Sequence, residues 1–327
     1  MQGKSIAAIY FILFSIFASA EANSKPKTAV CKTCAESQKF DKVCPVITAP
    51  CSRSKISEID TILDKIYAAK KPIVLYVHGR GNEPKKTLKE HIVETLEKDY
   101  GIKVLMFNWN SKALLLHRPV NEALEGGVSL RNVIERLAKY RLSNPDKKVI
   151  PVSLLVHSMG NIAFRKAMEE FPVELNSEPV FTNILMTGSD EDAEGHNIWV
   201  EQLKSDGTIL ITFNEQDGTL SYSHHPDGKS PLGLNPKLPL ANNAYYMNVT
   251  GLVGKVHRVF TKGKQHNRVG ICNIFTSMLR GEKLTLTIGS NIKEIKNERF
   301  LVPIDNQDTE NMCFQGVKND PDEENEK

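Results

Sequence analysis

Ser158 lies in the stretch V-S-L-L-V-H-S-M-G-N, residues 152–161, where an apolar run ends abruptly at a polar pair. A serine hydroxyl becomes a nucleophile when a neighbouring base removes its proton. A sharp turn from a strand into a helix would expose that hydroxyl and point N–H groups at a developing negative charge. The stretch nearly matches G-x-S-x-G, with Gly160 present and Val156 in place of the first glycine. It therefore predicts either a nucleophile on a tight turn or a serine that only caps a helix.

A second polar cluster, His78-Gly79-Arg80-Gly81, follows the apolar run of residues 72–77. Glycines at a strand end allow a turn with positive φ, and this need alone could explain them. Backbone N–H groups in such a turn can also stabilise an oxyanion, and one such donor contributes about 3 kcal/mol. Because the carboxyl ends of parallel strands share one edge of a sheet, we expect this turn to lie beside Ser158.

Taken together, the two clusters resemble those of the serine hydrolases of the α/β-hydrolase superfamily, in particular lipase-like and uncharacterised bacterial members with an H-S-M-G turn. The resemblance covers roughly residues 72–279. It implies that Ser158 is the nucleophile and that the N–H groups of Arg80 and Met159 form the oxyanion hole. It also implies the chain order serine, acid, histidine.

The acid and the base are expected downstream of Ser158. Asp217 follows the fifth predicted strand, where the superfamily has its acid, with Glu215 and Asp190 as alternatives. His266 lies next to the predicted closing helix of residues 270–279, and we favour it as the base. His257 is the alternative, because it could lie in the same loop after the last predicted strand.

Strands and helices alternate along most of the chain. A continuous apolar run typical of a strand buried on both faces covers residues 72–77. Further strands are expected at residues 102–108, 149–156, 181–187, 208–213 and 244–250. Helical patterns cover residues 56–69, 87–99, 121–142, 159–171, 197–204 and 270–279. The order predicts an α/β fold with a doubly wound, mostly parallel sheet, the α/β-hydrolase fold that the resemblance also implies.

The N-terminus predicts export. Residues 1–20 carry one lysine, a long apolar stretch and small residues at A-x-A spacing, as in a cleaved signal peptide. An exported chain with an even number of cysteines is expected to form disulfides. The six cysteines are Cys31, Cys34, Cys44, Cys51, Cys272 and Cys313. Pairing within the first four, and between the last two, is one scheme among several.

These features divide the chain into four parts. Residues 1–20 are the signal peptide, 21–56 a short disulfide-rich leader, 57–315 the α/β-hydrolase domain, and 316–327 a disordered acidic tail. The net charge of +3 is small for 327 residues and gives no indication of nucleic-acid binding. No segment of the mature chain is apolar enough to span a membrane.

We therefore expect a secreted or periplasmic serine hydrolase that cleaves a small-molecule or lipid carboxylic ester. Amides and thioesters remain open as substrates, because the same groups can cleave them. No metal and no other cofactor is expected. The alternative is a catalytically inactive hydrolase-fold protein that binds a ligand or partner, as the missing glycine at Val156 allows. A thiol-disulfide protein built on Cys31-x-x-Cys34 is a more distant reading.

Overall fold

The computed structural model describes residues 46–49, 56–81, 92–112, 118–169, 171–172, 175, 178–223, 228–261, 269–286, 288, 292–296 and 299–303. Within this part of the chain, no helix is long and apolar enough to cross a membrane.

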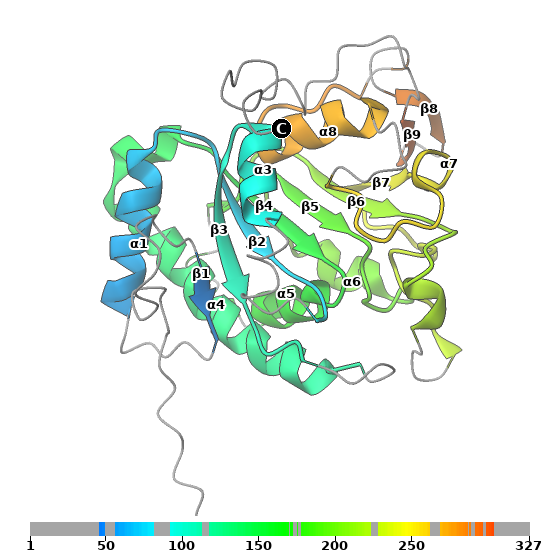
Figure 1. The fold of residues 1–327 in the computed structure, drawn as a ribbon, viewed down its shortest axis with the longest axis horizontal. Coiled ribbons are helices and arrows are strands. Elements are labelled where there is room, and N and C mark those ends of the chain that lie inside the picture. The colour runs from blue at the N-terminus through cyan, green and yellow to red at the C-terminus, as the bar shows by residue number, and fades with distance from the viewer. Residues whose placement is uncertain are drawn as a thin grey trace, which may run out of the picture.

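A nine-stranded sheet runs through the middle of the molecule (Figure 1). The strands are β1 (Val46–Thr48), β2 (Ile73–Val77), β3 (Lys103–Asn108), β4 (Val152–His157), β5 (Ile184–Thr187), β6 (Ile209–Phe213), β7 (Ala244–Asn248), β8 (Ile292–Lys296) and β9 (Phe300–Pro303). Their order across the sheet is β1-β3-β2-β4-β5-β6-β7-β9-β8. Neighbouring strands are parallel, except for β8 and β9, which are antiparallel.

The register brings the chemistry-bearing residues to one edge. Val77 at the end of β2 pairs with Val156 on β4, and His157 at the end of β4 pairs with Thr187 on β5. The polar residues that follow β2, β4 and β6 therefore emerge at the same carboxyl-terminal edge.

Helices cover both faces of the sheet (Figure 1). The helices are α1 (Ile56–Ala68), α3 (Ile92–Tyr100), α4 (Val120–Ser143), α5 (Gly160–Glu169), α6 (His196–Val200), α7 (Thr250–Val253) and α8 (Val269–Leu279), with 3-10 turns η3 (Pro145–Val149) and η5 (Leu220–Tyr222). Buried residues of α1, α4 and α5 form one core with alternate strand residues, and those of α3, α7 and α8 form another with the intervening ones. This arrangement is the doubly wound α/β fold expected from the sequence.

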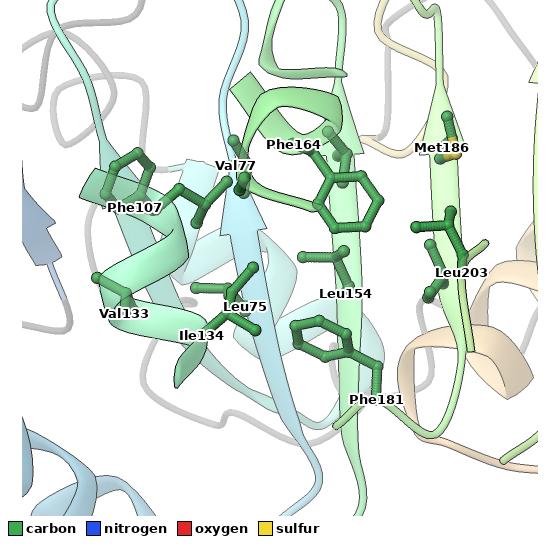
Figure 2. Close-up of a cluster of buried hydrophobic side chains, with 14 of the residues drawn as sticks. Leu75, Val77, Phe107, Val133, Ile134, Leu154, Phe164, Phe181, Met186 and Leu203 are labelled. Carbon is green, nitrogen blue, oxygen red and sulfur yellow. The ribbon is translucent and has the colours of Figure 1, made fainter. Parts of the chain in front are cut away.

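Figure 2 shows part of the core between the sheet and the helices α4 and α5. Leu75 of β2 lies beside Ile134 of α4, and Leu154 of β4 lies beside Phe164 of α5. Each of these side chains is fully buried. Burial of one such side chain stabilises the fold by about 1.5–3 kcal/mol.

The structure differs from the sequence-based expectation at both ends of the sheet. The strand β1 lies within residues 21–56, which were expected to form a disulfide-rich leader outside the domain; the described residues do not support that leader. The β8–β9 hairpin and the four-residue α7 were not expected at all.

The cysteines lie mostly outside the described residues. Cys272, on α8, is the exception, and it is disulfide-bonded. Its partner lies beyond the described part, so the expected bridge to Cys313 stays a prediction. The signal peptide and the acidic tail also lie outside the described residues.

Candidate active site

Ser158 stands on a strained turn between β4 and α5. Its φ is +55°, in the left-handed region that residues other than glycine rarely adopt. The N–H of Ser158 donates to Thr187 O on the neighbouring strand at 3.0 Å, which ties the turn to the sheet. This strand–turn–helix geometry is the one expected of a nucleophilic serine rather than of a regular helix cap.

Two glycines permit the close contacts of this turn. A Cβ on Gly160 would lie 2.7 Å from His78 O and 2.8 Å from Val77 O, so no other residue fits between the helix and β2. A Cβ on Gly79 would lie 2.5 Å from the Cβ of Ser158 and 3.1 Å from its Oγ. The turn after β2 therefore lies directly against Ser158.

Val156 occupies the place of the missing first glycine without loss of packing. Its side chain is fully buried in the core that also contains residues of α5. The valine that replaces the first glycine of G-x-S-x-G is therefore packed in the core below the turn.

The turn after β2 is fixed by the side chain of His78. Its Nδ1 lies 2.7 Å from Gly79 O, and its Nε2 lies 2.9 Å from Asn108 Oδ1 and 3.3 Å from the backbone N of Trp109. Burial lowers the pKa of His78 to about 4, so the ring is neutral at pH 7 and its Nδ1–H donates to Gly79 O. Because C=O and N–H of one peptide group point in opposite directions, this bond also orients the N–H of Arg80.

Asp217 and His257 form a hydrogen-bonded pair. His257 Nδ1 donates to Asp217 Oδ2 at 2.7 Å. The other carboxylate oxygen of Asp217 accepts the backbone N–H groups of Thr219 and Leu220 at 2.8 and 2.9 Å, and the residue is 1% exposed. With Nδ1 donating, Nε2 of His257 is left as a proton acceptor.

The segment that carries His257 is held against the end of β6. Asn214 Nδ2 donates to Gly254 O at 2.7 Å and to Val256 O at 3.0 Å, and Gly218 N donates to Lys255 O at 3.2 Å. His257 in turn lies beside the end of β5, because a Cβ on Gly188 would be 3.0 Å from its Cε1.

The geometry favours His257 over His266 as the base. His266, the residue preferred from the sequence, lies outside the described residues, whereas His257 is the histidine that contacts Asp217. From the sequence, the base was expected next to the closing helix, at His266. The chain instead forms α7 after β7 and returns to the sheet edge at residues 255–257. A helix of four residues is too short to show a hydrophobic periodicity in the sequence.

The two alternative acids have other partners. Glu215 accepts a hydrogen bond from Asn248 Nδ2 at 3.2 Å. Asp190 accepts one from Arg118 Nε at 3.1 Å and one from Ser223 Oγ at 2.5 Å. Neither is the carboxylate that contacts His257.

His157 is a residue whose position the sequence analysis missed. Its ring lies 4.7 Å from that of His257 and 5.1 Å from that of Phe260, measured between centroids. Burial, with a further contribution from His257, lowers its pKa well below 6.5. A neutral ring therefore packs against His257, and its adjacency to Ser158 in sequence was the available signal.

The remaining observations concern metal ligands and a cavity away from this site. Among the described residues, no group of three His, Cys, Asp or Glu side chains could hold a metal ion. A cavity of about 290 Å³ is lined by residues of the C-terminal end of α4 and by residues that precede β4, β5 and β6. It therefore lies at the opposite, amino-terminal edge of the sheet.

One comparison with known proteins agrees with the fold. A family model described as "Alpha/beta hydrolase of unknown function (DUF900)" matches residues 54–229, more than half of the chain. No curated protein matches. Lipase B of Aspergillus fumigatus is 13% identical with a TM-score of 0.31, and the match covers 55% of this chain and 47% of the lipase, so the chain spans about half its length. A Trichoderma reesei cutinase, solved with a phosphonate inhibitor, is 14% identical with a TM-score of 0.24, over 43% of this chain and 69% of the cutinase.

Proposed function

The chain belongs to this family of α/β-hydrolases, and on that premise we propose that it is a serine hydrolase that cleaves carboxylic esters. One observation carries the proposal: the 2.7 Å hydrogen bond between Asp217 and His257, at the sheet edge where Ser158 stands at positive φ. Nucleophile, base and acid follow the roles of a Ser-His-Asp triad, with His257 in place of His266.

In the proposed reaction, Ser158 Oγ attacks the acyl carbonyl carbon while His257 Nε2 takes its proton. Asp217 holds the tautomer with Nδ1–H and stabilises the imidazolium that forms. His257 then gives the proton to the departing alcohol oxygen. A water molecule, deprotonated by the same histidine, releases the acid and restores Ser158.

The oxyanion of each tetrahedral intermediate would be bound by the N–H groups of Arg80 and Met159. Support comes from the position of their peptide groups: Gly79 touches Ser158, and Met159 follows it at the start of α5. Donors fixed before the reaction are effective because they need no reorganisation as charge develops.

We propose further that the protein is exported and acts on a small-molecule or lipid ester outside the cytoplasm. The apolar stretch and A-x-A spacing of residues 1–20 support this proposal. N-terminal sequencing of the mature protein would test it. We expect a chain that starts at Glu21, after cleavage behind Ala20, or at Asn23, after cleavage behind Ala22. Retention of Met1 would contradict the proposal.

A fluorophosphonate probe tests the nucleophile. The wild type is expected to be labelled, and Ser158→Ala is expected to lose all labelling while it keeps its thermal transition. A well-folded wild type that resists the probe would indicate instead the inactive binding protein that the sequence also allowed.

Turnover of p-nitrophenyl esters tests the base. His257→Ala is expected to lower kcat by about 10⁴-fold or more, because the base and the serine act as a unit. His266→Ala is the matched control and is expected to keep most of the activity. Loss of activity in His266→Ala but not in His257→Ala would identify His266 as the base.

A further inference from the structure

The carbonyl group of Ser158 is held by three donors. Asn161 contributes two of them, its backbone N–H at 3.0 Å and its side-chain Nδ2 at 2.9 Å. The backbone N–H of Asp190, from the loop after β5, contributes the third at 3.3 Å. A carbonyl oxygen has two lone pairs, so three donors use its full capacity and fix its direction.

The direction of that carbonyl matters for the reaction. Ser158 C=O and Met159 N–H belong to the same planar peptide group and point in opposite directions. Any group that fixes the carbonyl on one side therefore fixes the N–H on the other. The proposed oxyanion donor of Met159 is thus oriented from behind by Asn161 and Asp190.

If Asn161 served packing alone, its buried amide would lower the stability of the fold. Its side chain is completely buried, and its Oδ1 has no hydrogen-bond partner within the described part of the chain. A buried polar atom without a partner destabilises a fold, and an apolar side chain of similar size would avoid this cost. The part of the amide that forms a hydrogen bond is its NH₂ group, which donates to Ser158 O.

We propose that Asn161 is a positioning residue for catalysis, which acts on the oxyanion through the Ser158–Met159 peptide. This inference rests on the proposed serine-hydrolase function. Asn161 touches neither substrate nor reacting atoms. Its effect is to keep Met159 N–H aimed at the place where the negative charge develops.

The test compares Asn161→Leu and Asn161→Ala with the wild type. Both variants lack the NH₂ donor, and two backbone donors to Ser158 O remain. We expect kcat for a p-nitrophenyl ester to fall about ten-fold, less than for loss of a whole oxyanion donor, with KM unchanged. The melting temperature of Asn161→Leu is expected to stay level or rise, because the unpartnered Oδ1 is gone.

Ile162→Val is the matched control. Ile162 is the next residue on α5 and is buried in the same core, but its side chain offers no hydrogen bond to the turn. It is expected to lower the melting temperature slightly and to leave kcat unchanged.

The outcomes separate the two proposals. A folded wild type that neither turns over esters nor reacts with a fluorophosphonate overturns the serine-hydrolase function. An active wild type whose kcat is matched by both Asn161 variants overturns the positioning role alone. Loss of the thermal transition in both variants also overturns it, because the amide would then serve the fold.

Discussion

Gly79 brings two backbones into contact at the centre of the candidate site. A side chain at this position would lie 2.5 Å from the Cβ of Ser158, closer than packed atoms approach. The turn after β2 and the turn after β4 therefore depend on each other. At the residue scale, the geometry of the site depends on backbone contacts that only small residues such as Gly79 allow.

Gly79→Ala tests this dependence. Either Ser158 or the Arg80 N–H must move to admit the methyl group, so we expect kcat to fall at least about 100-fold and stability to fall by about 1–3 kcal/mol. Ester turnover and thermal unfolding would be measured together. Gly251→Ala is the control, since a Cβ there meets nothing within 4 Å, and it should leave kcat unchanged. Wild-type turnover in Gly79→Ala would show that the turn has room to yield.

Single residues were predictable where their chemistry leaves a local pattern. Ser158 has its signature in the five residues around it, and Asp217 follows an apolar run that could be recognised as a strand. His257 has no such pattern, because its position depends on how the chain returns to the sheet after α7. The contact between His157 and His257 joins residues 100 positions apart and could not be read from the sequence.

At the scale of elements, the proposed base His257 lies on a short connection rather than on a helix or strand. Residues 254–257 are held by hydrogen bonds from Asn214 and Gly218 at the end of β6. Asp217, on the turn after β6, forms a hydrogen bond with His257 directly. One connection after β6 thus positions both members of the pair.

Asn214→Ala should separate activity from stability. It removes two hydrogen bonds to the backbone of the segment that carries His257, so we expect kcat to fall about ten-fold and stability to fall by about 1–3 kcal/mol. Asn243→Ala is a matched control, because Asn243 Nδ2 likewise donates to two backbone carbonyls, those of Val200 and Leu203. Equal loss of kcat in the two variants would argue against a specific role for Asn214.

The elements themselves were predictable to the extent that they carry apolar patterns. β2, β4 and β6 are buried along their whole length and so appear as mostly apolar runs. β1 has three residues, and α7 has four, too few for any period to show. β8, I-K-E-I-K, mixes charged with apolar residues, as a strand at the sheet edge does.

At the scale of the whole molecule, burial keeps three histidines uncharged. Burial lowers the pKa of His78 to about 4, lowers that of His157 well below 6.5, and lowers that of His196. In the unfolded chain these rings take up protons near pH 6.5. The folded state binds fewer protons below that pH, so its stability is lost as the pH falls from 6.5 towards 4.

Urea unfolding at pH 7.5 and pH 5 measures this loss. His78 alone should account for about 2 kcal/mol of the decrease at pH 5, given a shift from 6.5 to about 4. His78→Gln is expected to be less stable at pH 7.5 but to lose less on acidification. A variant whose stability falls as steeply as that of the wild type would mean that His78 is not the group that titrates.

The strand order also sets the pace of folding. Val46 on β1 pairs with Met106 on β3, and Met247 on β7 pairs with Leu301 on β9, so the strands of these two pairs lie more than fifty positions apart in sequence. Folding rates fall as the mean separation of contacting residues grows. A chain of this topology spends a long time without its sheet, with strand edges open to aggregation. Slow folding suits the proposed export, because the chain would still be extended when it meets the membrane and its sheet would form on the far side.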